Sequence, residues 1–166
     1  TDEDYPGRVA ELCRNDPQRW REVCLLAGAK AKKGMAESIW YLSEALCYRE
    51  LDDPETETSD VWGALLAGQA LAESADLTRV PPRHQSKLNR VKQWLIRIIG
   101  GDQLPALERV NAGNALSRLG DPRFNPEKWF LPDDESLGFV QIPAGEFVMG
   151  EGEKRHTVTL SEYAIA

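Results

Sequence analysis

Long apolar runs, paired cysteines and an excess of positive charge are all missing from this sequence. No apolar run approaches the roughly 18 residues of a membrane-spanning helix, so the sequence favours a protein without membrane contact. The three cysteines, Cys13, Cys24 and Cys47, are odd in number and show no C-x-x-C spacing. They are predicted to be small buried side chains rather than metal ligands or disulfide partners. The net charge of −7 argues against general affinity for nucleic acid.

What the sequence does contain is typical of a globular protein. Hydrophobic residues make up 42% and charged residues 28% of the 166 positions, which is enough for one good hydrophobic core. Because the chain starts with Thr1 rather than Met, we expect it to be a segment of a longer protein.

Apolar residues recur at helical spacing from Tyr5 to Leu119, and proline and glycine divide this stretch into six predicted helices. Asp16-Pro17 offers an N-cap and a first-turn proline, and Gly120 offers a helix end. The acidic loop Asp52–Ser59 is expected to be solvated and mobile. The predicted helices are Tyr5–Asn15, Pro17–Gly34, Met35–Leu51, Val61–Ala75, Pro82–Ile99 and Pro105–Leu119.

A short motif recurs in three of these helices and suggests a repeat. Leu65-Leu66-Ala67-Gly68 resembles Leu25-Leu26-Ala27-Gly28 upstream and Val110-Asn111-Ala112-Gly113 downstream, a spacing within the roughly 40–47 residues of HEAT and armadillo units. A glycine inside a helix costs about 1 kcal/mol relative to alanine, so we expect Gly68 and Gly113 to lie at close helix contacts. The alternative is that the recurrence is chance. The sequence therefore predicts a mainly α fold, in which three helical hairpins form a HEAT-like α-solenoid.

The pattern changes near the C-terminus to alternating apolar and polar residues, which predicts strands. The first two predicted strands flank a predicted turn at Pro143–Gly145. About thirty residues of β structure cannot bury a core, so this β tail is expected to pack against the helices through Trp129 and Phe130, or to pair with another chain or with the rest of a longer protein. We predict a helical domain at residues 1–132 and a β segment at 133–166. The predicted strands are Phe139–Ile142, Glu146–Met149, His156–Leu160 and Tyr163–Ile165.

The β tail resembles the start of the formylglycine-generating-enzyme (sulfatase-modifying factor) family. The residues that carry the resemblance are Ile142-Pro143-Ala144-Gly145 with Phe147, Met149 and Gly150, followed by His156-Thr157-Val158-Thr159-Leu160. The resemblance covers about the last 28 residues and departs from the family at Arg155, where a proline often precedes the histidine. It implies the first strands of such a domain. The cysteines and copper of the oxidase would lie beyond Ala166.

The helical region is similar to that of bacterial NACHT/STAND-type signalling proteins, through Arg8–Cys13 with Asp16–Glu22 and through Glu108–Gly113 with Leu119–Phe124. This resemblance implies a non-catalytic interaction or sensor segment of a larger cytoplasmic signalling protein, such as a defence-related NTPase, joined to a formylglycine-enzyme-like domain. The alternative is the N-terminal piece of a formylglycine-generating oxidase or ligand-binding domain. Gly150–Lys154 lacks the spacing and the Ser/Thr of a phosphate loop. No residue is predicted to be catalytic or to bind a cofactor or metal.

A basic stripe on the fifth predicted helix is the candidate binding surface. Its members share one helical face and include an aromatic side chain, which suits an acidic protein surface or the remainder of a longer protein better than nucleic acid. The alternative is a solvated outer face, and His84 beside this stripe is expected to be exposed. The stripe consists of Arg83, Lys87, Arg90, Trp94 and Arg97.

Overall fold

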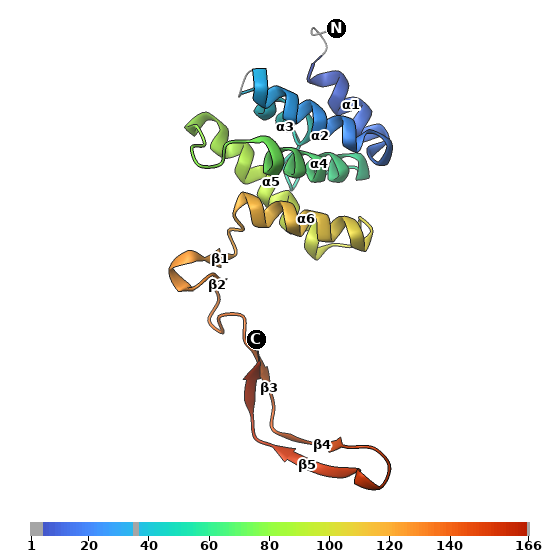
Figure 1. Cartoon of the computed structure of the whole chain (residues 1–166), viewed down its shortest axis with the longest axis vertical. Helices are drawn as coiled ribbons and strands as arrows, with labels where there is room; N and C mark the ends of the chain where they lie inside the picture. Colours follow the sequence, from blue (N-terminus) through green and yellow to red (C-terminus); the bar gives the residue numbers. More distant parts are fainter. Residues whose placement is uncertain (1–4, 35–36, 166) are drawn as a thin grey trace. The chain divides into compact units, whose positions relative to one another are not determined.

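The chain divides into a helical unit and a β unit (Figure 1). The computed structural model describes residues 5–34 and 37–165. Contacts separate Thr1–Asp121 from Pro122–Ala166, earlier in the chain than the predicted boundary after residue 132. The prediction of a mainly helical chain that ends in a short antiparallel β segment is confirmed. Within the described residues, no helix is both long and apolar enough to span a membrane.

Six α-helices make up the described part of the helical unit, close to the predicted ranges. Asp16 caps the second helix, because its Oδ1 accepts a hydrogen bond from the backbone N–H of Arg19 at 3.2 Å. The third helix ends before the predicted Leu51, and its predicted start at Met35 lies outside the described residues. The helices are α1 (Gly7–Asn15), α2 (Pro17–Gly34), α3 (Ser38–Leu46), α4 (Thr58–Ser74), α5 (Pro82–Gly100) and α6 (Ala106–Leu119).

Helix α4 is the centre of the helical unit and contacts all five other helices (Figure 1). Its apolar residues surround the helix instead of forming one stripe, which is typical of a buried helix. Consecutive helices pack as the pairs α1 with α2, α3 with α4, and α5 with α6. Contacts of α2 with α4, and of α4 with α6, join one pair to the next.

Two glycines explain how closely other elements approach α4. A Cβ added to Gly68 would lie 2.8 Å from Leu95 Cδ1 of α5, so the predicted close contact at Gly68 is confirmed. A Cβ added to Gly63, which the sequence analysis did not single out, would overlap the carbonyl oxygen of Leu46 at the end of α3. The same prediction for Gly113 is wrong, because among the described residues no atom lies within 4 Å of its added Cβ.

The described part of the β unit, residues 122–165, contains six short strands in three antiparallel pairs. β1 pairs with β2, β3 with β6, and β4 with β5. The four strands predicted from the alternating pattern are all present. The strands are β1 (Phe124–Asn125), β2 (Leu131–Pro132), β3 (Val140–Ile142), β4 (Gly145–Met149), β5 (His156–Leu160) and β6 (Tyr163–Ile165).

The segment predicted as a turn, Pro143–Gly145, does not join two strands that pair with each other. Because β3 pairs with β6 and β4 with β5, the segment between β3 and β4 is a bend along one arm of a two-stranded ribbon. The chain reverses instead between Met149 and His156, where Gly150 has φ 90°. Phe147 lies opposite Val158 in this register, and Phe147 remains 44% exposed. The ribbon therefore has an apolar face but no core of its own.

Candidate functional site

The predicted basic stripe lies on the side of α5 that meets α3 and the segment after it. Arg83 forms an ion pair with Glu37, and Lys87 forms one with Glu44. Arg90 Nη1 lies 2.8 Å from Oε1 of Glu50. These basic side chains are therefore engaged by acidic groups of the same chain, and they hold α5 against the α3 segment.

The remaining two members of the stripe also have partners within the helical unit. Arg97 donates a hydrogen bond to the carbonyl oxygen of Leu51. The indole Nε1 of Trp94 donates to the carbonyl oxygen of Arg49 at 2.9 Å, and Trp94 is only 1% exposed. Trp94 is thus a core residue in this structure. A partner-binding role for the stripe stays a prediction, and it would require these internal contacts to be given up.

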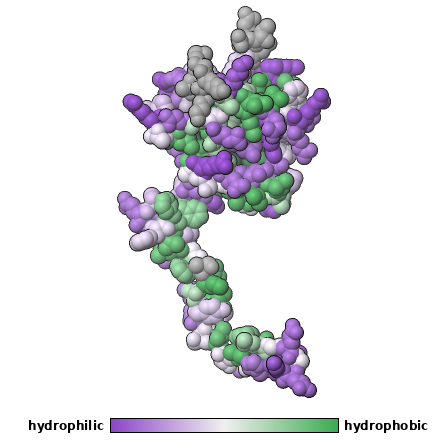
Figure 2. All heavy atoms as spheres, viewed as in Figure 1, coloured by the Kyte–Doolittle hydropathy of each residue, from purple (hydrophilic) through white to green (hydrophobic). Residues whose placement is uncertain are grey.

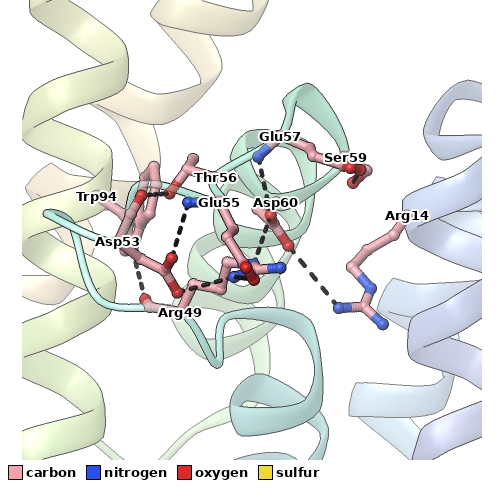
Figure 3. A network of polar contacts seen from close by, with 9 residues as sticks. All are labelled: Arg14, Arg49, Asp53, Glu55, Thr56, Glu57, Ser59, Asp60 and Trp94. Atoms are coloured by element: carbon pink, nitrogen blue, oxygen red, sulfur yellow. Dashed lines mark hydrogen bonds and ion pairs between the residues drawn. The ribbon is translucent and has the colours of Figure 1, made fainter.

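A polar network at the start of α4 organises the acidic loop that precedes it (Figure 3). Arg49 lies at its centre, with Nη1 2.8 Å from Asp53 Oδ2 and Nε 3.0 Å from Asp60 Oδ2. Asp60 Oδ2 also accepts the backbone N–H of Glu57 at 3.0 Å, as part of a capping box that satisfies donors at the helix start. Figure 3 shows Arg14 of α1 approaching the same carboxylate from the other side, at 4.0 Å.

The loop is solvated, as predicted, because Asp52, Pro54 and Glu55 are exposed and none of its residues before Asp60 is buried. Its side chains nevertheless give it a defined conformation, and its mobility stays a prediction. Asp53 folds the loop back on itself by accepting the backbone N–H of Glu55 at 2.9 Å. This bond and the neighbouring Arg49 guanidinium lower the pKa of Asp53 below its usual range. The composition of the loop signalled exposure, but it gave no sign of the arginine that organises it.

His84 is buried, contrary to the predicted exposure. It is 2% exposed, and its ring stacks on Trp40 of α3 with centroids 4.9 Å apart and planes 4° from parallel. Arg83 Nε lies 3.3 Å from Nε2 of His84, which fits a neutral ring that accepts at this nitrogen. Burial lowers the pKa of His84, and the positive charges of Lys87 and Arg83 lower it further, against an opposing effect of Glu44.

The three cysteines are buried free thiols, as predicted. Burial raises the pKa of Cys47 to about 12, so this thiol is protonated at neutral pH. Cys24 has its pKa raised by a hydrogen bond with Cys13, whose own pKa is lowered. Among the described residues, no group of three or more His, Cys, Asp or Glu side chains could hold a metal ion.

An ion pair between α2 and α6 is the main polar contact that the sequence analysis missed. Arg21 pairs with Glu108, whose side chain is 9% exposed and which also accepts from Asn111 Nδ2 at 3.1 Å. This pair joins the first helical pair to the third. No periodicity signals it, because its members lie 87 positions apart.

A cleft lies between α4 and α6 in the helical unit. Its volume is about 160 Å³, and Gln69, Asn111 and Arg118 are among the residues that line it. Small-molecule sites usually measure roughly 300–1,000 Å³ and are mostly apolar. The size and polarity of this cleft do not suit a cofactor or a typical substrate.

Comparison with known proteins gives one relative of informative similarity. Nucleolar protein 16 of Coccidioides immitis (strain RS) is 36% identical over 95 residues, an alignment that covers 48% of this chain. The alignment covers 40% of that relative, so the chain spans about two fifths of its length. No protein-family model matches the chain, and no solved structure matches it either.

These findings contradict the resemblances drawn from the sequence. The relative is a eukaryotic nucleolar protein, not a bacterial NACHT/STAND signalling protein, and no formylglycine-enzyme family model matches the β tail. The predicted cytoplasmic signalling role and its alternative, a piece of a formylglycine-generating oxidase, are therefore wrong. The physical reason is that both resemblances rest on short patterns. A strand, a Pro-Ala-Gly bend and a second strand describe a local backbone path that unrelated chains can adopt.

Proposed function

We propose that this chain is a non-catalytic helical module, a short solenoid of three hairpins, that holds a protein partner. The observation that carries this proposal is the order of packing: each consecutive helix pair contacts the next pair along the chain. Such stacking gives extended surfaces that suit binding of other proteins. The cleft between α4 and α6 is too small and too polar to favour an enzyme site.

The nucleolus is the place where we propose that this module acts. The support is the printed name of the relative, Nucleolar protein 16, and the 36% identity to it. The alignment covers two fifths of that protein, and imaging in cells tests the assignment for this chain.

Within a nucleolar assembly, we expect the module to contact protein rather than RNA. The net charge is −7, whereas RNA binding draws on unpaired basic side chains. The basic residues of α5 that could have formed such a surface pair with Glu37, Glu44 and Glu50.

Imaging of the tagged full chain in eukaryotic cells tests the proposal. We expect the protein to concentrate in nucleoli and to stay there after brief permeabilisation and RNase treatment. The tag alone is the control for distribution. In solution, we expect no binding to a mixed-sequence RNA at about 0.15 M salt, where exposed charges are screened beyond about 8 Å.

Two results would overturn the proposal. An even distribution identical to that of the tag alone would remove the nucleolar assignment. Loss of nucleolar signal with RNase, together with RNA binding by the purified chain, would replace the protein partner by RNA.

A further inference from the structure

The recurring glycine motif occupies corresponding positions in α2, α4 and α6, and the first two copies are covered in the same way. An added Cβ at Gly28 of α2 would lie 3.0 Å from Ile39 Cδ1 of α3. At Gly68 of α4 it would lie 2.8 Å from Leu95 Cδ1 of α5. In both copies, therefore, the next helix along the chain places a branched apolar side chain directly over the glycine.

The third copy, on α6, lacks such a cover within the described residues of the helical unit. No atom lies within 4 Å of an added Cβ at Gly113. Val110 is 58% exposed, whereas the matching Leu65 of α4 is completely buried. Leu107, one turn before Val110, is 68% exposed. Figure 2 shows hydrophobic atoms gathered along the α6 edge of the helical unit.

We propose that this outer face of α6, formed by Leu107, Val110 and Gly113, docks an amphipathic helix of another polypeptide. The docked helix places a leucine or isoleucine over Gly113, as Ile39 and Leu95 do over the earlier glycines. This inference rests on the proposed function of the chain as a binding module, and it names the surface that binds. The contacts of Ile39 with Gly28 and of Leu95 with Gly68 indicate which side chain the docked helix presents.

The covering helices define what the partner must present. α5 buries apolar side chains at steps of three and four: Leu88, Val91, Leu95 and Ile98 are each 4% exposed or less. α3 does the same with Ile39, Leu42 and Leu46. An i, i+3, i+7 apolar stripe centred on Leu or Ile is thus the expected signature of the partner helix.

The glycine explains why the occupant is a helix rather than an extended strand. Without a side chain at Gly113, the backbone of α6 is open to close approach by the ridge of a second helix. A mid-helix glycine costs about 1 kcal/mol of stability relative to alanine, and at Gly113 no contact among the described residues offsets this cost. The exposed polar residues Asn114 and Ser117 continue the same face of α6 toward the C-terminal end of the helix, and Arg118 lies beside them.

A peptide with the sequence of α5, Pro82–Gly100, is the probe, because it carries the covering stripe that the chain itself uses. A fluorescent version is titrated with the intact 166-residue chain and followed by anisotropy. We expect saturable binding that weakens roughly tenfold or more when Leu95 of the peptide is alanine, because a buried leucine loses most of its apolar area. Gly113→Leu in the chain places a side chain in the space over residue 113 that the peptide's leucine would occupy, and it should weaken binding at least as much.

The matched control is Gly100→Leu, which adds the same side chain at another helical glycine with no atom within 4 Å of its Cβ. This variant should bind the peptide like the unaltered chain. Equal binding by the Gly113→Leu and unaltered chains would overturn the proposal, as would no binding at about 1 mM peptide, the limit of weak association. A concentration-dependent dimer abolished by Gly113→Leu would also overturn it, by making a second copy the occupant.

The peptide titration and the nucleolar imaging together distinguish failure of the α6 docking surface from failure of the proposed function. Nucleolar retention that Gly113→Leu leaves unchanged, together with failed peptide binding, rejects the α6 face and keeps the proposed module. Peptide binding that requires Gly113, in a protein that does not concentrate in nucleoli, keeps the surface and rejects the nucleolar assignment.

Discussion

Replacing Gly63 by alanine is the most direct perturbation of the packing around α4. The added Cβ would overlap the carbonyl oxygen of Leu46, and it would lie 3.2 Å from Cγ and Cδ of Arg14. The arginine side chain can move aside, but the carbonyl belongs to the backbone at the end of α3. Relief therefore requires α3 and α4 to separate.

The expected magnitude follows from two opposing effects. Overpacking of this kind costs about 1–3 kcal/mol, and exchange of a mid-helix glycine for alanine gains about 1 kcal/mol. Gly63→Ala should thus lower the free energy of unfolding by up to about 2 kcal/mol. Gly113→Ala, with open space around the new methyl group, should raise it by about 0.5–1 kcal/mol.

Urea unfolding followed by circular dichroism measures both variants against the unaltered chain. The same chemical change is made in two helix interiors, so the difference between the variants isolates the contact with Leu46. We expect the two to differ by about 1–3 kcal/mol, or roughly 2–12 °C in Tm. If Gly63→Ala proves as stable as Gly113→Ala, α3 and α4 do not pack as described.

Three further predictions test other parts of the helical unit. Burial lowers the pKa of His84 in the folded state, so its neutral form contributes fully to the free energy of unfolding above the unfolded pKa of about 6.5, and this contribution falls as the pH drops below that value. His84→Phe should remove most of this fall. An equal pH dependence in both proteins would count against a buried neutral ring. Trp40→Ala should cost about 3–5 kcal/mol in thermal or urea unfolding and Trp20→Ala clearly less, because Trp40 is 3% exposed and Trp20 only partly buried; equal losses would contradict this difference. Arg90→Glu should destabilise by up to about 1 kcal/mol through repulsion of Glu50, and the double variant with Glu50→Arg should recover part of it; no recovery would mean that the pair contributes nothing.

Local signals in the sequence were sufficient to locate the helices. Pro17 and Pro82 stand at the first helical positions predicted for them, and Gly120 follows α6 with φ 87°, a conformation that glycine adopts without strain. These signals act within one turn of the chain, so they are readable without knowledge of the tertiary structure. The same is true of the alternating residues of β4 and β5.

Contacts between distant segments could not be predicted in this way. The predicted binding role of the basic stripe did not take Glu37, Glu44 and Glu50 into account, because helical periodicity places residues on one face but does not say what that face meets. His84 was expected at the surface for the same reason, although it lies against Trp40. Pairing of β3 with β6 required knowledge that Pro143–Gly145 is a bend in one arm.

The repeated glycines show both the use and the limit of an internal repeat. The recurrence correctly indicated a close approach at Gly68, and the structure adds the same contact at Gly28. The recurrence did not predict the open space at Gly113, because a glycine allows close approach of a neighbouring helix but does not show that such a helix is present. That difference between the copies is the basis for the docking surface inferred on α6.

Site-specific photo-crosslinking tests the central claim, that the chain is a protein-binding module with its interface on α6. A benzophenone amino acid replaces Leu107, and in a second protein it replaces Leu26 of α2, which is similarly exposed at 67% against 68%. Both tagged proteins are irradiated in eukaryotic cells, and nucleolar fractions are analysed by mass spectrometry. The account predicts a discrete adduct from position 107 to an amphipathic helix of another protein, and none from position 26. No adduct at position 107, or the same set of adducts from both positions, would contradict it.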